Sequence, residues 1–226
     1  MRTPRYFFTG DFSAFHKYFL SRPHERRRFA RGEFLWPPGE PFEHIHYIVS
    51  GTARACVEHE NGRRKIVSFH GAGTLFPVYH RLDYKIELAI TTEALSPVET
   101  LEFTRAGFGA MFADNPALAA ALVDWYSSYV NLLLYDTAHQ EYNCSFLKLC
   151  NLLYLLAPAG GLDAVTQEEL ADILGTSRVN LTRGLAQLRS EGVIRTLRGR
   201  IEITDRNALA RHCSLETVEP SFDTIL

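Results

Sequence analysis

The stretch Thr166-Gln167-Glu168-Glu169-Leu170-Ala171-Asp172-Ile173-Leu174-Gly175-Thr176-Ser177-Arg178 decides the fold of the C-terminal part of the chain. Thr166 and Glu169 have the spacing of a capping box, in which each side chain accepts from a free backbone N–H at the start of a helix. Gly175 suits the left-handed conformation that ends a helix, and Ser177 can cap a second helix almost at once. Two helices joined by so short a turn cross steeply, so the stretch predicts a helix-turn-helix.

The second helix has one apolar face, formed by Leu181, Leu185 and Leu188. The opposite side presents Arg178, Val179, Thr182 and Arg183. Arginine can pair with guanine O6 and N7, valine can contact a thymine methyl group, and hydroxyls suit phosphates. Residues 175–200 hold six arginines and one glutamate, in a chain whose net charge is −2. This basic island predicts DNA binding, and a surface helix with merely solvated arginines is the alternative.

A wing is predicted directly after this helix. Residues 193–196 and 201–204 alternate apolar and polar side chains around a tip that carries Arg198 and Arg200. The pattern predicts a β-hairpin whose tip touches the DNA backbone. The full set of candidate DNA contacts is Thr166, Thr176, Ser177, Arg178, Val179, Thr182, Arg183, Arg198 and Arg200.

The N-terminal half has the glycine spacing of a β protein. Between residues 29 and 103, glycines separate short apolar runs, which is typical of a β-roll or jelly-roll-like sandwich. Asn61-Gly62 predicts a two-residue type I′ hairpin turn. Residues 1–28 are predicted to be partly helical from apolar side chains at helical spacing, which are Phe12, Phe15, Phe19 and Leu20. The run Arg26-Arg27-Arg28 forms either a solvated face or a phosphate-contacting patch.

A long helix is predicted to begin at Asn115-Pro116, where Asn can cap and Pro is tolerated. Its apolar side chains follow heptad spacing and form one seam, made of Leu118, Leu122, Trp125, Tyr129 and Leu132. The seam pairs either with a second copy of the chain or with its own β domain. A second apolar helix, over about residues 146–156, ends before Pro158.

We therefore expect an α+β protein with three parts. These are an N-terminal β-roll sensor domain (1–115), dimerisation and connecting helices (116–160) and a C-terminal winged helix-turn-helix (161–226). The 226 residues, 46% of them hydrophobic, are enough to build packed cores. No uninterrupted apolar run reaches the roughly 20 residues of a membrane span, and the first residues lack a secretory signal. We expect a cytoplasmic protein without membrane contact, whose four scattered cysteines are free thiols.

These parts resemble the Crp/Fnr superfamily of transcription regulators over about residues 24–212. The most specific string runs from Thr166 to Arg178 and continues through Thr182-Arg183 to Gly192-Val193-Ile194. The resemblance implies that Ser177, Arg178 and Arg183 contact double-stranded DNA. It also implies a homodimer on an inverted repeat, and contact with RNA polymerase. Val179 stands where the family often has Glu, so the resemblance does not fix the half-site.

In the β region, Gly39, Tyr47-Ile48-Val49-Ser50-Gly51 and Gly71-Ala72-Gly73 resemble the family's cyclic-nucleotide-binding roll. Its cyclic-nucleotide binders carry a Gly-Glu pair and a later Arg-Ser or Arg-Thr, and residues 73–77 and 83–87 have neither. We therefore expect an effector other than cyclic AMP. The N-terminal cysteines of the iron–sulfur branch are missing, since the first cysteine is Cys56. The sequence points to no cofactor and does not identify the effector.

The residues that fall near the family's effector pocket are Phe76, Tyr79, Tyr84, Lys85, Trp125 and Tyr129. They predict an apolar aromatic site with one cation, suited to an acidic ligand, as in branches that sense aromatic or halogenated compounds. Core packing accounts for the same aromatic residues equally well.

Two metal-based alternatives remain open. In a cupin-like enzyme, His44 and His46 on one strand face would hold a metal, although the Glu of that pattern does not follow. In a haem sensor, the axial ligands would come from His44, His46, His70, His80 and Cys56. The sequence has no Gly-rich phosphate loop, nucleophile elbow or H-E-x-x-H motif, so we expect a regulator that is not an enzyme and holds no metal.

Overall fold

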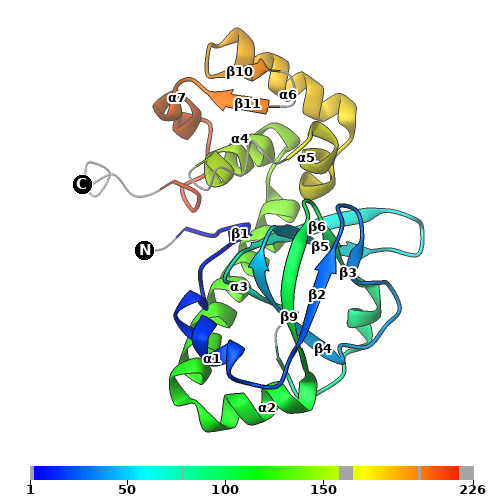
Figure 1. Ribbon diagram of the computed structural model, residues 1–226. Helices are drawn as coiled ribbons and strands as arrows, with labels where there is room; N and C mark the ends of the chain where they lie inside the picture. The colour runs from blue at the N-terminus through cyan, green and yellow to red at the C-terminus, as the bar shows by residue number, and fades with distance from the viewer. Residues whose placement is uncertain (1–2, 78, 158–164, 198–199, 219–226) are drawn as a thin grey trace. The chain divides into compact units, whose positions relative to one another are not determined.

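The computed structural model describes residues 3–77, 79–157, 165–197 and 200–218. These residues form two compact units (Figure 1). One unit consists of residues 7–127, and the other joins residues 3–6 to the described residues from 128 onward. Helix α3 (Pro116–Tyr142) runs from the first unit into the second.

Two sheets build the unit of residues 7–127. One has the strand order β1 (Phe7–Phe8), β6 (Arg64–Gly71), β5 (Thr52–Glu58), β8 (Ile90–Ala94) and β3 (Phe34–Trp36). The other has the order β2 (Glu25–Phe29), β9 (Val98–Thr104), β4 (His44–Ser50) and β7 (Leu75–Phe76). Alternate residues of both sheets meet in a buried apolar cluster, which contains Leu35, Ile48, Ala53, Ala94 and Val98. The predicted β-roll is confirmed.

The first 28 residues are less helical than their apolar spacing predicts. Their helical part is limited to η1 (Ser13–Phe15) and α1 (His16–Leu20), while β1 and β2 take the two flanks. β1 pairs in parallel with β6, so Phe7 lies opposite Phe69 and Phe8 opposite His70. That pairing joins segments about 60 residues apart, and local periodicity does not reveal it.

The arginine run Arg26-Arg27-Arg28 lies on β2, at the edge of its sheet. The side chains are exposed and form ion pairs with β9, Arg26 with Glu99 at 3.3 Å and Arg27 with Glu102 at 3.8 Å. The solvated alternative therefore fits, and charged side chains on an edge strand also discourage pairing with other sheets.

The hairpin between β5 and β6 is confirmed, but the two-residue type I′ turn is wrong. Glu58 pairs with Arg64, so the connection is longer than two residues. Gly62 has a φ of +77°, whereas Asn61 does not have positive φ. The N–H of Gly62 donates to the carbonyl of His59 at 2.9 Å, which closes the turn.

Helix α2 (Arg105–Asp114) leads into α3, which begins where predicted. The Asn115 side chain accepts from the N–H of Leu118 at 3.1 Å. The heptad seam packs within the chain instead of across a twofold axis, because its leucines and Trp125 are buried. The opposite face of α3 is exposed and still partly apolar, with Val123, Val130 and Leu134 in line.

Helix α3 is also long and apolar enough to cross a membrane by length and composition, with a mean hydropathy of 1.2 over 18 residues. The expectation that no uninterrupted apolar run reaches the roughly 20 residues of a membrane span still holds for this helix. Searching for uninterrupted apolar runs missed the helix because Asp124 and Asp136 lie within it. The physical reason for its hydropathy is that both the buried seam and the exposed face are apolar.

The second unit holds the predicted helix-turn-helix. Its elements after α3 are α4 (Ser145–Leu156), α5 (Gln167–Leu174), α6 (Arg178–Ser190), β10 (Ile194–Leu197), β11 (Arg200–Ile203) and α7 (Arg206–Arg211). Helix α4 packs on the helices of the helix-turn-helix and on α7. The domain division predicted from the sequence places this helix in the connecting segment of residues 116–160.

Candidate functional site

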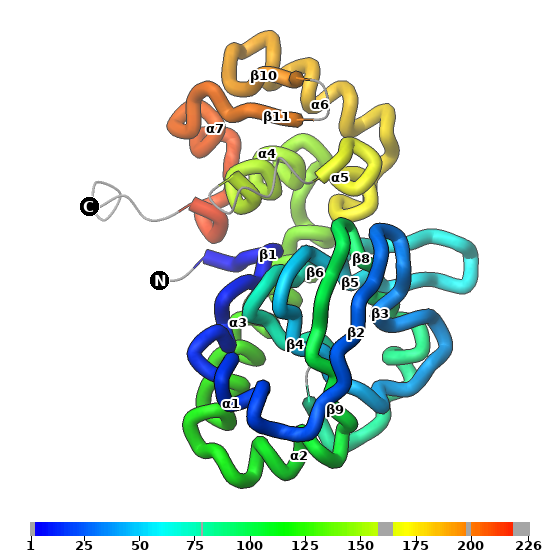
Figure 2. Tube along the Cα trace, viewed as in Figure 1, coloured from blue at the N-terminus to red at the C-terminus, as the bar shows by residue number. Residues whose placement is uncertain are grey.

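The turn between α5 and α6 is held by side-chain caps at both helices. Thr166 Oγ1 accepts from the N–H of Glu169 at 3.2 Å, and the Glu169 carboxylate accepts from the N–H of Thr166 at 2.7 Å. Gly175 ends α5 in the left-handed conformation, with a φ of +58°. Ser177 Oγ accepts from the N–H of Asn180 at 3.2 Å at the start of α6. Figure 2 traces this run from α5 through α6 to β10 and β11.

The two faces of α6 divide as predicted. Leu181, Leu185 and Leu188 are buried, whereas Arg178, Val179, Thr182 and Arg183 are exposed. The exposed side chains line a shallow hollow together with Ala186. Thr182 Oγ1 donates to the carbonyl of Arg178 at 2.8 Å, and Arg178 forms an ion pair with Glu168 of α5.

The sequence did not predict how closely α4 and α6 approach each other. A Cβ added at Gly184 would lie 2.7 Å from Leu149 Cδ2, a distance that real contacts do not reach. A glycine in a helix interior is normally unfavourable, so its presence marks a close helix crossing. Thr176, a candidate DNA contact, instead donates its hydroxyl to Ser145 Oγ at 3.2 Å, at the N-terminus of α4.

Strands β10 and β11 form the predicted antiparallel wing, with Leu197 opposite Arg200 next to the tip. Arg195 and Arg200 are exposed, and Arg189 of α6 donates to Thr196 Oγ1 at 3.0 Å, which ties the hairpin to the helix. Arg198 lies outside the described residues. The arrangement can present cations beside a DNA backbone.

The residues predicted to line an effector pocket are spread over different surroundings. Phe76 and Trp125 are buried in one aromatic cluster, where Phe76 lies 4.1 Å from His70 and Trp125 lies 5.2 Å from Phe8 between ring centroids. Tyr79 packs on Phe108, with ring centroids 5.7 Å apart. Core packing therefore accounts for these three side chains.

The other three predicted effector residues are more accessible. Tyr84 and Lys85 are exposed at the start of η2 (Lys85–Ala89), and Tyr129 is half-buried in the second unit. Within η2, the Glu87 carboxylate is buried and lies 3.0 Å from His80 Nε2. Tyr126 OH donates to the carbonyl of Tyr79 at 2.6 Å, and burial raises the pKa of Tyr126 to about 12.

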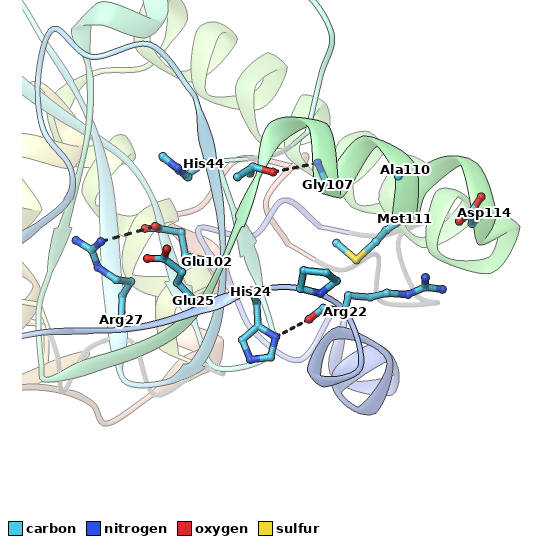
Figure 3. Close-up of a pocket in the computed structure, with 12 residues that line it drawn as sticks. Arg22, His24, Glu25, Arg27, His44, Glu102, Gly107, Ala110, Met111 and Asp114 are labelled. Carbon is cyan, nitrogen blue, oxygen red and sulfur yellow. Dashed lines mark hydrogen bonds and ion pairs between the residues drawn. The ribbon is translucent and has the colours of Figure 1, made fainter.

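A cavity of about 620 Å³ lies elsewhere in the same unit, between the ends of β2, β4 and β9 and helix α2 (Figure 3). Its polar wall carries Arg27, His44 and Glu102, and its apolar wall includes Met111. A neighbouring cavity of about 440 Å³ shares the same three polar residues. Sequence reasoning missed this site because its lining comes from segments far apart in the chain.

Two family models match the chain. A cyclic nucleotide-binding domain matches residues 26–115, and a Crp-like helix-turn-helix domain matches residues 147–212. The chain belongs to the Crp/Fnr superfamily. Proteins of this superfamily are transcription regulators, not enzymes, so the cupin-like alternative is not supported.

Several Crp/Fnr regulators are similar over most of their length. The cyclic AMP receptor protein of Thermus thermophilus is 27% identical over 80% of this chain and 84% of its own. The global nitrogen regulator of Synechococcus elongatus is 24% identical over 85% and 91%. The solved structure of FixK2 from Bradyrhizobium japonicum has a TM-score of 0.74 at 17% identity and covers 85% of this chain and 98% of that one, which shows the fold.

Three of the residues considered as axial haem ligands have surroundings that do not favour binding iron. His46 and His70 are buried against hydroxyls, His46 Nδ1 at 3.3 Å from Thr100 and His70 Nε2 at 2.9 Å from Ser68. Burial raises the pKa of Cys56 to about 11, which disfavours the thiolate that binds iron. Within the described ranges, no three His, Cys, Asp or Glu side chains gather as metal ligands.

Proposed function

We propose that this Crp/Fnr regulator is a cytoplasmic homodimer that binds an inverted repeat in double-stranded DNA and responds to a small molecule other than cyclic AMP. The observation that carries the proposal is the exposed face of α6, on a helix whose start is capped and whose opposite face is buried. A helix presented in this way can enter the major groove with its N-terminal residues toward the bases. Recruitment of RNA polymerase would then follow from the position of the site in a promoter.

Arg178, Val179 and Arg183 are proposed to contact bases. Arg200, an exposed residue of the wing, is proposed to contact the DNA backbone. The hydroxyls of Thr182 and Ser177 already take part in bonds within or at the start of α6. Thr166 and Thr176 likewise support the turn, and phosphate contacts would add to that role. This division separates sequence readout from general electrostatic attraction.

Selection of fragments from a random duplex pool by the purified protein tests the DNA-binding proposal. An inverted repeat should be enriched. Arg183→Ala should then weaken binding by about 1–3 kcal/mol and relax one base position, while Arg200→Ala should weaken binding to all sequences. Arg211→Ala, which removes an exposed arginine from α7, serves as the control. Equal, sequence-independent losses in the two test variants would contradict the division of roles.

The proposed dimer uses the exposed face of α3. Val123, Val130 and Leu134 recur at intervals of seven and four residues, so they form one stripe along the helix. Exposed apolar stripes of this kind mark interaction surfaces. A symmetric pair of α3 helices would bury the stripe of each copy on the other and place two recognition helices about 34 Å apart, one helical turn of DNA.

The surroundings of η2 support an effector other than cyclic AMP. Glu87 is buried there beside His80, so a cyclic phosphate in this position would meet a carboxylate. Like charges brought together in a poorly solvated site repel each other. A ligand with an aromatic body and one acidic group would instead pack on Tyr84 and pair with Lys85, the two exposed residues of the predicted pocket.

Thermal shifts with cyclic AMP and with a panel of aromatic acids test the effector class. We expect stabilisation by an aromatic acid and none by cyclic AMP. Tyr84→Ala with Lys85→Ala should abolish the shift, whereas His44→Ala, which changes the wall of the separate cavity, should not. Stabilisation by cyclic AMP, or loss of the shift only with His44→Ala, would contradict the proposed site.

A further inference from the structure

The residues that follow α7 are bound to α3 and α4 by buried hydrogen bonds. We call residues 214–218 the C-terminal strap. Thr217 of the strap is fully buried, although it lies in a turn and not in a strand. The strap also lies beyond residue 212, where the match to the Crp-like helix-turn-helix model ends. The match to that model therefore does not account for the contacts of the strap.

One end of the strap is fixed to α4. Asn151 Nδ2 donates to Ser214 Oγ at 2.8 Å, and Asn151 Oδ1 accepts from the N–H of Ser214 at 2.9 Å. Asn151 is fully buried, so these contacts to the strap are largely shielded from solvent. Buried polar groups with satisfied, directional partners hold one geometry, because any other leaves them unpaired.

The other end of the strap is fixed to α3. Thr217 Oγ1 lies 2.7 Å from Tyr135 OH and 2.9 Å from Ser214 Oγ, so the two ends share a chain of hydrogen bonds. His139 of α3 completes the network, with its Nδ1 atom 3.3 Å from Asn151 Nδ2 and 3.0 Å from Asn143 Nδ2. Burial lowers the pKa of His139, which favours the neutral ring.

The network joins the helix proposed to form the dimer to the helices that carry the DNA-reading face. Tyr135 and His139 belong to α3, and Asn151 belongs to α4, which contacts α6 at Gly184. The direction of α6 relative to the C-terminal half of α3 is therefore fixed by the strap as well as by apolar packing. In a symmetric dimer, that direction sets the separation of the two recognition helices.

We infer that the C-terminal strap is a positioning element that determines the half-site spacing this regulator accepts. The inference rests on the proposed function, since spacing has meaning only for a dimer on an inverted repeat. Releasing the strap would leave the side chains of α6 unchanged and would widen the range of separations that the two helices can adopt. Affinity for one half-site and selectivity for spacing thus become separate properties of the same protein.

The test measures affinity of the full chain for inverted repeats that carry the selected half-sites and differ by single base pairs in spacing. Thr217→Val removes the hydroxyl that links the strap to Tyr135 and keeps the side-chain shape. Tyr135→Phe removes its partner and is the second variant. Thr91→Val is the matched control, because Thr91 is also buried and its hydroxyl donates to Glu58 at 3.3 Å in the other unit.

We expect the wild type and Thr91→Val to prefer one spacing. In Thr217→Val and Tyr135→Phe the preference over neighbouring spacings should fall about three- to tenfold, the effect of one buried hydrogen bond. Binding to an isolated half-site should stay the same. Unchanged spacing selectivity in both variants, or equal losses on half-site and full site, would overturn the inference. Failure of the wild type to bind any inverted repeat would overturn the proposed function itself.

Discussion

The ring of His46 lies on β4 with almost no exposed surface, between Thr100 and Glu102 of β9. Its Nε2 atom is 3.7 Å from the Glu102 carboxylate, too far for a hydrogen bond. Burial is the largest influence on this ring, followed by the charges of His44 and Arg27, and together they lower the pKa of His46 to about 3. The folded protein therefore keeps His46 neutral where the unfolded chain binds a proton.

Acid should destabilise the protein through His46. Because the unfolded state takes up the proton below pH 6.5 and the folded state only near pH 3, stability falls as the pH drops through this window. At pH 5 the loss should be about 2 kcal/mol. Urea unfolding at pH 7 and pH 5 measures it. His46→Gln should reduce the difference, whereas His59→Gln, at an exposed site, should not.

At the scale of secondary structure, the crossing of α4 and α6 depends on the missing side chain of Gly184. Gly184→Ala should destabilise the protein by about 1 kcal/mol, because moving the buried Leu149 side chain away from the new methyl group costs more than alanine gains over glycine within a helix. Leu149→Ala should also destabilise it, by removing buried volume. The double variant should lose less than the sum of the two, since the methyl group then has room. Strictly additive losses in denaturant unfolding would exclude this contact.

Elements defined by neighbouring residues were predictable from the sequence, and those defined by distant pairing were not. The leucines of α6 and the cap at Thr166 follow from spacings of three, four and seven residues. The strand at Phe7 and Phe8 exists only because β6 lies beside it. The cavity lined by Arg27, His44 and Glu102 combines three strands, so no local pattern reveals it.

The seam of α3 illustrates a different limit. Heptad spacing at Leu118, Leu122 and Trp125 identified an apolar face, but spacing does not say what covers that face. In the structure the same chain covers it, and the remaining apolar stripe lies on the opposite side. Val123, Val130 and Leu134 are separated by polar residues and by residues of the seam. A search for a single apolar seam therefore does not detect the second stripe.

At the scale of the whole molecule, assembly and DNA binding should fail together. Val130→Glu with Leu134→Glu places carboxylates on the exposed stripe of α3, where Leu134 is 67% exposed, so folding should be little affected. Sedimentation should then report a monomer, because a dimer would have to bury four charges. Affinity for an inverted repeat should fall to that of a half-site.

Asn131→Glu, on an exposed neighbouring face of α3, is the control for this change. It adds one of the same charges without touching the stripe. A dimer that survives both substitutions on the stripe would show that association uses another surface.

The ion pair between Arg178 and Glu168 bears on how such a regulator would search a chromosome. In the free protein, Arg178, which we propose to contact a base, is already paired with a carboxylate. On random sequence, Arg178 would give up that partner for a phosphate and gain little, since an exposed pair and a phosphate contact are similar in strength. At the right base it would gain two directed hydrogen bonds. Glu168 would thus compete with DNA for Arg178. The residence time at non-specific sites would shorten, while the residence time at the operator would remain long.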